Sequence, residues 1–342
     1  MSKISAHRMG KINLGIVGAA GAVGKEILRS LEHYEVPVGT LKLFGGSRSI
    51  GTQLEYNGTS YTVEGTSNES FQGLDYALFS AGSSISKKFR EDCAQHNCII
   101  IDNSSAFRME EGVPLVIPEI NPESLQSHAG VIANPNCSTI ILLMAIEPLR
   151  RLGKIKRLSV STYQAASGAG QEAMNELLTA TRSFLDDKPF TPEIMPVDYA
   201  FNFFSHNSSI NELGRNEEEQ KMIQESKKIL SDDEMEIFVT CIRVPVLRAH
   251  GESVMIEFDG PAPSIEESKA ALEKFPGLKL VDDREKNNFP TPREVSGGFD
   301  VAAGRIRHSD QNPNTLELFV VGDQLLKGAA QNAVQILKEL VS

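Results

Sequence analysis

Cys137 is the residue best placed to do covalent chemistry. It lies between a turn-forming Asn134-Pro135-Asn136 and an apolar run, Thr139 to Ile146, that predicts a buried helix. Free backbone N–H groups and the positive end of the helix dipole gather at such a position, and both favour a thiolate over a thiol. Cys137 is therefore a candidate nucleophile. The alternative is a small buried cysteine in front of a core helix, which is the commoner setting of a free cysteine.

Two more side chains have the chemistry to assist a thiolate. Arg243 stands between an isoleucine and a valine in an alternating run, Met235 to Val246, so it faces the side opposite its apolar neighbours. His250 follows beside a glycine at a predicted bend between strands. A lone histidine is more often structural, but one beside a glycine on a loop, in a chain with a candidate thiolate, gains weight as a general acid or base.

A glycine-rich turn near the N-terminus is typical of nucleotide binding. An apolar strand, Ile12 to Val17, leads into Gly18-Ala-Ala-Gly21-Ala-Val-Gly24, and helical spacing follows from Lys25 to His33. Glycines in this context allow a pyrophosphate to rest on the helix N-terminus. The G-x-x-G-x-x-G spacing departs from the standard G-x-G-x-x-G, and a turn without a ligand is the alternative.

The end of the second predicted strand indicates which dinucleotide binds. Leu41 to Phe44 is followed by Gly45-Gly-Ser-Arg48-Ser49, where an NAD enzyme carries a carboxylate for the ribose 2′-hydroxyl. An arginine flanked by serines suits a 2′-phosphate instead, so NADP is favoured over NAD. The alternative is a solvated loop arginine.

These elements predict a Rossmann-type α/β unit followed by a second domain. More strands are predicted at Leu74 to Phe79 and Cys98 to Asp102, with a helix between them at Ser84 to His96. We expect residues 1–136 with 323–342 to form the nucleotide-binding domain. The second part of that domain is predicted as one helix, Asp323 to Val341, that packs onto the first.

Residues 137–322 are predicted to form an α+β domain for substrate binding and dimerisation, with a large mixed sheet. One strand ends in Gln164, and the Ser167-Gly168 turn after it could meet a phosphate or the nicotinamide end of a cofactor. On a predicted helix, Asn216 to Leu230, Glu218 and Lys221 share a face. Their spacing alone favours a solvated surface ion pair.

The composition excludes several classes of protein. The 342 residues favour two domains, and the shares of hydrophobic (40%) and charged (23%) residues are ordinary for a globular chain. A net charge of −11 without basic blocks argues against nucleic-acid binding. Residues 1–11 lack the apolar stretch of a signal peptide, and no run is long enough to span a membrane. We expect a cytoplasmic protein with four free cysteines and no metal.

Along essentially its full length the sequence resembles the aspartate-β-semialdehyde dehydrogenase family. The motifs that carry the resemblance occur in the family's order, and they are Gly18-Ala-Ala-Gly-Ala-Val-Gly24, Asn103-Ser-Ser-Ala-Phe-Arg108, Asn134-Pro-Asn-Cys-Ser-Thr139, Ser161-Thr-Tyr-Gln-Ala-Ala-Ser-Gly-Ala-Gly170, Glu218-Glu-Gln-Lys-Met222, Arg243-Val-Pro-Val246, His250-Gly-Glu-Ser253 and Lys327-Gly-Ala-Ala-Gln-Asn332. Ala20 departs from the frequent threonine in the glycine turn, and alanine keeps the backbone geometry.

The resemblance implies a reaction. Aspartate 4-semialdehyde, phosphate and NADP⁺ would interconvert with 4-aspartyl phosphate and NADPH, through a cysteine acyl-thioester, in the synthesis of lysine, methionine and threonine. The family is usually a homodimer built on the sheet of the second domain, and sometimes a tetramer.

The resemblance also implies roles for individual residues. The catalytic residues would be Cys137 as nucleophile, His250 as general acid/base and Gln164, which orients the substrate. Arg243 would bind the substrate carboxylate and Glu218 its amino group. This role replaces the interpretation of Glu218 and Lys221 as a surface ion pair. Phosphate would be held by Arg108, Lys221 and Asn136, and the cofactor by Gly18, Ala20, Gly21, Ala22, Val23, Arg48, Ser49, Ser167, Gly168 and Asn332.

Two other functions remain open at this point. N-acetyl-glutamyl-phosphate reductase shares the architecture and the cysteine chemistry, but its substrate is longer and has no free amino group. The Asn-Pro-Asn-Cys-Ser-Thr motif and the Glu218/Lys221 pair favour aspartyl phosphate. A catalytically silent paralogue is the third possibility, although Cys137, His250, Gln164 and Arg243 are all present.

Overall fold

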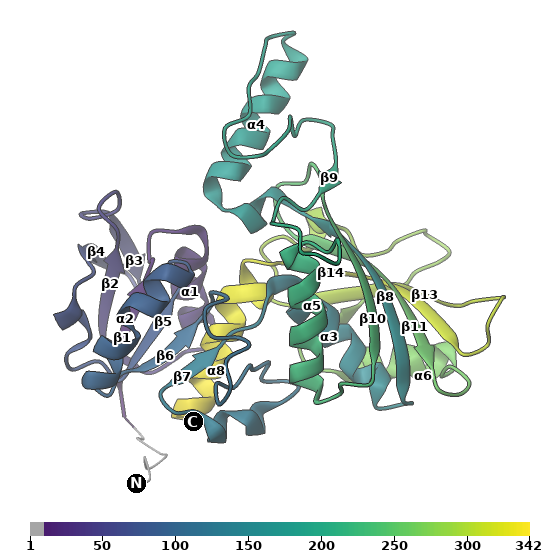
Figure 1. Cartoon of the computed structure of the whole chain (residues 1–342), viewed down its shortest axis with the longest axis horizontal. Helices are drawn as coiled ribbons and strands as arrows, with labels where there is room; N and C mark the ends of the chain where they lie inside the picture. The colour runs from purple at the N-terminus through teal and green to yellow at the C-terminus, as the bar shows by residue number, and fades with distance from the viewer. Residues whose placement is uncertain (1–9) are drawn as a thin grey trace. The chain divides into compact units, whose positions relative to one another are not determined.

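The computed structural model describes residues 10–342, which divide into two compact units (Figure 1). Residues 1–9, where the sequence predicts no signal peptide, lie outside the described part. Unit 1 contains the residues up to Asn136 together with Ala329–Ser342, and unit 2 is Cys137–Gly328. None of the helices within residues 10–342 combines the length and apolar character that crossing a bilayer requires.

The predicted return to the first unit at residue 323 differs from the structure, because residues 323–328 belong to unit 2. Asp323 accepts hydrogen bonds from Arg248 Nε and Gly297 N, both at 2.6 Å, and these tie the segment to unit 2. The predicted helix also begins later. Asp323 Oδ1 accepts from Leu325 N at 3.0 Å, and a π-helical turn, Leu326–Ala330, precedes the helix proper.

Unit 1 is built on a seven-stranded sheet with the order β3-β4-β2-β1-β5-β6-β7. Neighbouring strands are parallel except for the hairpin β3-β4, whose turn at Asn57-Gly58 has positive φ at both residues and which the sequence analysis did not predict. The strands are β1 (Ile12–Val17), β2 (Val38–Gly45), β3 (Gln53–Tyr56), β4 (Thr59–Gly65), β5 (Tyr76–Phe79), β6 (Ile99–Asp102) and β7 (Val131–Ala133).

Helices cover this sheet. They are α1 (Ala22–His33), α2 (Ser83–Gln95) and α8 (Gln331–Val341), with short 3₁₀ turns at Asn68–Phe71 and Pro122–Ser127. The apolar face of α1 contains Ile27 and Leu31, which are fully buried in one core cluster with Ile336 and Leu337 of α8. The C-terminal helix therefore packs in the first unit as the sequence predicted.

Unit 2 is built on a second seven-stranded sheet with the order β12-β13-β14-β11-β8-β10-β9. It is mixed, as predicted: β8 and β10 run parallel, whereas β11 is antiparallel to both β8 and β14. The strands are β8 (Ile155–Gln164), β9 (Phe204–Ser205), β10 (Glu236–Arg243), β11 (His250–Phe258), β12 (Leu278–Leu280), β13 (Val301–His308) and β14 (Thr315–Gly322).

Helices α3 (Cys137–Arg150), α5 (Glu217–Leu230) and α6 (Ile265–Lys274) cover one face of this sheet (Figure 1). Every residue of α3 from Ser138 to Leu149 is buried, which makes it the central helix of the unit. A 3₁₀ turn, Ala166–Ala169, leads from β8 into α4 (Gln171–Leu185), which stands away from the sheet, and α7 (Pro292–Val295) is a single turn.

Candidate active site

Three neighbouring strands of unit 2 begin or end at the same end of the sheet. Arg243, the last residue of β10, pairs in register with Gln164, the last residue of β8. His250 begins β11, and the next residue, Gly251, pairs with Tyr163 of β8. Because parallel β8 and β10 end where antiparallel β11 begins, the strand register places a guanidinium, a carboxamide and an imidazole in one row. All three side chains are buried.

Cys137 is the first residue of α3, so the predicted position at a helix N-terminus is confirmed. Within residues 10–342 none of the four cysteines forms a disulfide, and Cys137 is partly exposed whereas the other three are buried. The backbone at Gly328 packs closely against it, because a Cβ at Gly328 would lie 2.9 Å from Cys137 Cβ. Glycine at 328 thus leaves the space that the cysteine occupies.

Gln164 connects two helices at this edge. Its Nε2 donates to Ser138 Oγ in the first turn of α3 at 3.0 Å and to Glu218 Oε1 in α5 at 3.3 Å. The side chain therefore fixes the residue after Cys137 relative to Glu218.

Glu218 is buried, which shows that the surface ion pair inferred from spacing alone was wrong. Only 5% of the residue is exposed, and Lys221 Nζ lies 3.6 Å from its Oε2. Asn216 caps α5 by accepting from Glu219 N at 2.9 Å, so Glu218 stands in the first turn, where the helix dipole favours a carboxylate.

Arg243 is held by three acceptors. It donates from Nη1 to Ala165 O at 3.2 Å, from Nε to Asn207 Oδ1 at 3.4 Å and from Nη2 to His206 Nε2 at 2.9 Å. Burial and the nearby Arg243 charge lower the pKa of His206 to about 4, so this imidazole is neutral and accepts. Sequence reasoning missed His206 and Asn207, because neither lies in a motif that carries the family resemblance.

His250 is fixed by the backbone. Ala165 N donates to His250 Nδ1 at 3.0 Å, and Nε2 has no hydrogen-bond partner among the described residues. Burial and Arg243 lower the pKa of His250 to about 3. The preceding Ala249 has φ of 72° and is fully buried, an uncommon conformation for alanine that its hydrogen bond to Gln324 Oε1, at 2.9 Å, helps to hold.

Ser167 and Gly168 adjoin the same edge. A Cβ at Gly168 would lie 2.8 Å from Arg243 Nη1 and 3.1 Å from His250 Nε2, so only glycine fits there without displacing them. Ser167 Oγ accepts a short hydrogen bond from Gln324 Nε2. Gln324 thus joins the Ser167 turn to the backbone before His250, a connection that no sequence pattern indicated.

In unit 1 the glycine turn has the geometry of a phosphate cradle. Gly18 has φ of +86°, and a Cβ there would lie 2.8 Å from Ser80 O. A Cβ at Gly24 would lie 2.4 Å from Gly18 O, so α1 packs onto the turn only with glycine. Gly21, which follows Ala20, is the N-cap of α1, and the first turn of the helix, which begins at Ala22, contains no acidic residue. An anion fits this helix N-terminus.

Arg48 and Ser49 follow the end of β2. Arg48 is exposed, and Ser49 Oγ donates to Gly46 O at 3.0 Å. No carboxylate stands between the end of β2 and Ser49. The end of β2 therefore suits a nucleotide that carries a 2′-phosphate. β2 pairs with β1, which leads into the glycine turn at Gly18, and Val23 lies in the first turn of α1.

Arg108 and Asn332 both hold the loop before Cys137. Arg108 donates from Nε to Asn134 O at 2.9 Å and from Nη2 to Asn103 O at 2.7 Å. Asn332 Nδ2 donates to Asn134 Oδ1 at 2.6 Å and to Val116 O at 2.9 Å. Asn136, next to the cysteine, is buried. These hydrogen bonds join residues within unit 1. That Arg108, Asn136 and Asn332 also contact ligands stays a prediction.

Comparison with known proteins gives the same two parts. A family model described as "Semialdehyde dehydrogenase, NAD binding domain" matches residues 13–128, and one described as "Semialdehyde dehydrogenase, dimerisation domain" matches residues 146–327. The chain is 49% identical to the aspartate-semialdehyde dehydrogenase of Synechocystis sp. over 96% of its length and 97% of that protein. It is 43% identical to the Bacillus subtilis enzyme of the same name, with 96% and 97% covered.

Solved structures agree with the sequence relatives. The crystal structure of aspartate semialdehyde dehydrogenase II from Vibrio cholerae superposes with a TM-score of 0.93 at 37% identity, covering 96% of this chain and 98% of that one. A second structure of that enzyme, complexed with ASA, has the same TM-score at 36% identity and the same coverage.

Proposed function

The chain belongs to the aspartate-semialdehyde dehydrogenase family, and we propose that it interconverts L-4-aspartyl phosphate and L-aspartate 4-semialdehyde with NADP(H). The observation that carries the proposal is that Arg243 and Glu218 are both held at the end of β8, by different residues. Arg243 is bonded to Ala165 and Glu218 to Gln164. A substrate with both a carboxylate and an ammonium group needs a cation and an anion placed apart, and arginine can bind the carboxylate bidentately.

The covalent step belongs to Cys137. Its thiolate, favoured by the N-terminus of α3, attacks the acyl carbon, and phosphate leaves with the electron pair of the C–O bond. Gln164 orients the substrate, because it is held 3.0 Å from Ser138. Arg108, Lys221 and Asn136 are assigned to the phosphate, whose departure needs fixed positive charge. His250 acts at the reacting carbonyl.

When bound, NADPH would supply the hydride for reduction of the thioester. Gly18, Ala20, Gly21, Ala22 and Val23 would hold its pyrophosphate at the N-terminus of α1, and we assign its 2′-phosphate to Arg48 and Ser49. The match of residues 13–128 to an NAD-binding family model and the absence of a carboxylate after β2 support this assignment. Ser167, Gly168 and Asn332 are proposed to line the rest of the cofactor site.

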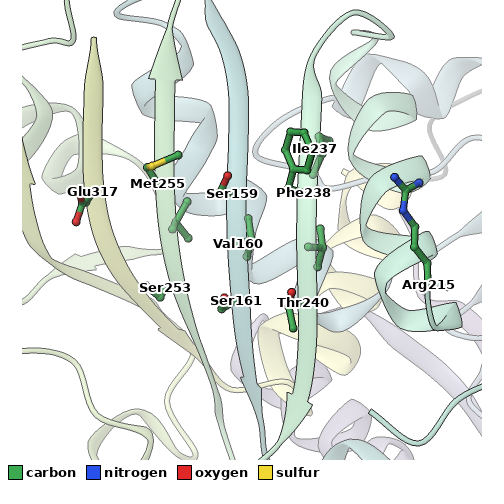
Figure 2. A pocket seen from close by; sticks show the side chains of 12 residues that line it. Ser159, Val160, Ser161, Arg215, Ile237, Phe238, Thr240, Ser253, Met255 and Glu317 are labelled. Atoms are coloured by element: carbon green, nitrogen blue, oxygen red, sulfur yellow. The ribbon is translucent and has the colours of Figure 1, made fainter. Parts of the chain in front are cut away.

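The open face of the unit 2 sheet is the surface we assign to a homodimer. On the covered face Cys241 of β10 touches Met222 of α5, with the two sulfurs 3.7 Å apart. Side chains of the opposite face, among them Ser161, Phe238 and Met255, line a shallow depression across β8, β10 and β11 (Figure 2). Phe238 is 54% exposed, and the family model that matches this region is a dimerisation domain. We expect this dimer to act in the cytoplasm.

Turnover of two substrates tests the proposed function. Purified protein should reduce NADP⁺ with aspartate semialdehyde and phosphate, and should turn over the N-acetyl-glutamyl compound far more slowly. Faster turnover of the latter would assign the chain to that reductase, and no turnover of either would favour a silent paralogue.

Trapping tests the nucleophile. Mixing with aspartate semialdehyde and NADP⁺ in the absence of phosphate, followed by denaturation, should leave the acyl group on the peptide that contains Cys137. Cys137→Ala should abolish this adduct and turnover, yet still bind NADP. A variant that fails to fold would show instead that the cysteine is structural.

A further inference from the structure

The residues that follow β14 are bonded to the residues that precede β11. The antiparallel ladder between these two strands ends at His250, and beyond it side chains make the contacts. Arg248 Nε donates to Asp323 Oδ2 at 2.6 Å, and Ala249 N donates to Gln324 Oε1 at 2.9 Å. The dipeptide Asp323-Gln324 therefore anchors the turn that leads into β11.

The Asp323 carboxylate is completely buried, and donors surround both of its oxygens. Oδ2 accepts from Arg248 Nε and from Gly297 N, both at 2.6 Å. Oδ1 accepts from Leu325 N at 3.0 Å and from Leu326 N at 3.3 Å. Only a carboxylate accepts at both oxygens. Asparagine has nearly the same shape, but it would direct an NH₂ group at one of the two sets of donors.

The backbone of Asp323 shapes the turn that contacts the candidate nucleophile. Asp323 O accepts from Gly328 N at 3.1 Å, and Gly328 lies in the π-helical turn Leu326–Ala330. A Cβ at Gly328 would lie 2.9 Å from Cys137 Cβ and 3.3 Å from Gln324 Cβ, so the glycine backbone packs closely against both side chains. Because it approaches the atom to which Sγ is attached, it restricts the directions in which the thiol can point.

We propose that Asp323 is a positioning residue for the reaction, which holds Gly328 against Cys137 so that the thiol stays at the N-terminus of α3, and which ties this contact to the turn before β11. The inference rests on the proposed function, in which Cys137 attacks the acyl carbon. Asp323 acts through Gly328 rather than on the reacting atoms. The helix dipole favours a thiolate only within the first turn, so a thiol released from its position is ionised less.

Alkylation of the thiol tests the inference without any substrate. Iodoacetamide reacts with the thiolate, and mass analysis of the peptide that contains Cys137 gives the rate at pH 7. We expect Asp323→Asn to be alkylated at least about fivefold more slowly than the wild type, because the favourable field of the helix N-terminus is lost. An equal or faster rate in the folded variant would overturn the inference.

Asp282→Asn is the matched control for the loss of a buried, paired carboxylate. The Asp282 side chain is 1% exposed and lies 2.6 Å from Lys269 Nζ, after the edge strand β12. We expect both substitutions to lower the midpoint of thermal unfolding, and only Asp323→Asn to slow the alkylation of Cys137. Slower alkylation in both variants would show a general effect of lost stability and would overturn the inference.

Arg248→Met tests the same anchor from its more exposed side, should Asp323→Asn fail to fold. The Arg248 side chain is 24% exposed, and its removal leaves the carboxylate its three backbone donors. We expect a milder effect, with alkylation of Cys137 slowed at least about twofold. A wild-type rate in folded Arg248→Met, with no folded Asp323→Asn to set against it, would count against the inference.

Turnover separates the inference from the proposed function. We expect kcat of Asp323→Asn with aspartate semialdehyde to fall about 10-fold to 100-fold, because a small displacement of a reacting atom is costly. Kd for NADP should stay within about threefold, since the proposed pyrophosphate cradle lies in unit 1. A wild-type kcat would overturn the inference. If the wild type turned over no semialdehyde while the alkylation rates differed as expected, the proposed function would fail and the placement of the thiol would stand.

Discussion

Arg243 donates from Nη2 to Nε2 of His206, with the two nitrogens 2.9 Å apart. Because arginine has no acceptor, Nε2 of His206 must accept and the imidazole must be neutral, while its Nδ1 lies 3.0 Å from Ser208 Oγ. The loop after β9 therefore holds the guanidinium through a different nitrogen from the one that donates to Ala165 O. This contact with His206 helps to fix the orientation of the Arg243 guanidinium, which is the proposed binding group for the substrate carboxylate.

Removing His206 should weaken binding more than chemistry. His206→Ala leaves Arg243 with one acceptor fewer, so we expect KM for aspartate semialdehyde to rise about tenfold with kcat changed less than threefold. His206→Gln, which can present an acceptor, should restore most of the binding. Steady-state kinetics at pH 8 measure both. A fall in kcat at unchanged KM would place His206 in the chemical step instead.

Protonation of His206 should have the same effect as its removal. With its pKa near 4, the imidazole is neutral above that pH and becomes a cation beside Arg243 below it. We expect kcat/KM of the wild type to fall as pH drops towards 4, and this acid limb to be missing in His206→Gln. Identical pH profiles for the two proteins would contradict the assignment.

A single methyl group at Gly168 should disturb two functional side chains at once. The added Cβ of Gly168→Ala would lie 2.8 Å from Arg243 Nη1 and 3.1 Å from His250 Nε2. We expect kcat/KM to fall at least about tenfold, with little change in thermal stability. Gly260→Ala is the matched control, because a Cβ there meets nothing within 4 Å. Equal activity of the two variants would remove Gly168 from the site.

Arg48 should set the preference for NADP. Arg48→Ala removes the proposed charge-assisted contact with the 2′-phosphate, worth about 1.5–3 kcal/mol, so Kd for NADP should rise about 10-fold to 100-fold. Kd for NAD should change little. Arg29→Ala removes the same charge from α1, where Arg29 pairs with Glu26 at 3.4 Å, and serves as the control. Titration of cofactor fluorescence measures both constants, and parallel changes for NADP and NAD would contradict the prediction.

Glu252 should make the wild type less stable at higher pH. This residue of β11 is fully buried, neither carboxylate oxygen has a hydrogen-bond partner among residues 10–342, and burial together with Glu218 raises its pKa well above the usual value. Its folded-state pKa exceeds the unfolded value of about 4.3, so stability is full below that pH and falls as pH rises towards the folded pKa.

Glu252→Gln should remove that fall. The amide has nearly the shape of the protonated acid and does not titrate. We expect the free energy of urea unfolding of the variant to exceed that of the wild type increasingly from pH 5 upwards, by up to about 1.4 kcal/mol per pH unit. Parallel stability curves would mean that Glu252 is ionised in the folded protein.

Much of the fold and of the chemistry follows from local patterns. The Asn-Pro-Asn turn followed by an apolar run predicts a helix that begins near Cys137, and α3 begins at that residue. The glycine turn after β1 and the absence of a carboxylate between β2 and Ser49 can likewise be recognised from residues that are neighbours in the chain. The hairpin β3-β4 was missed although Asn57-Gly58 is a good turn signal.

The tertiary structure alone decided which polar groups are buried and what they face. Glu218 and Lys221 have the spacing of a surface pair, and only the packing of α5 against β10 and α3 buries the carboxylate beside Gln164. His206, Gln324 and Ala165 act on Arg243 and His250 across long sequence separations. Desolvation and hydrogen-bond direction depend on distances between atoms that the order of residues does not contain, so the protonation states of this site could be assigned only from the folded chain.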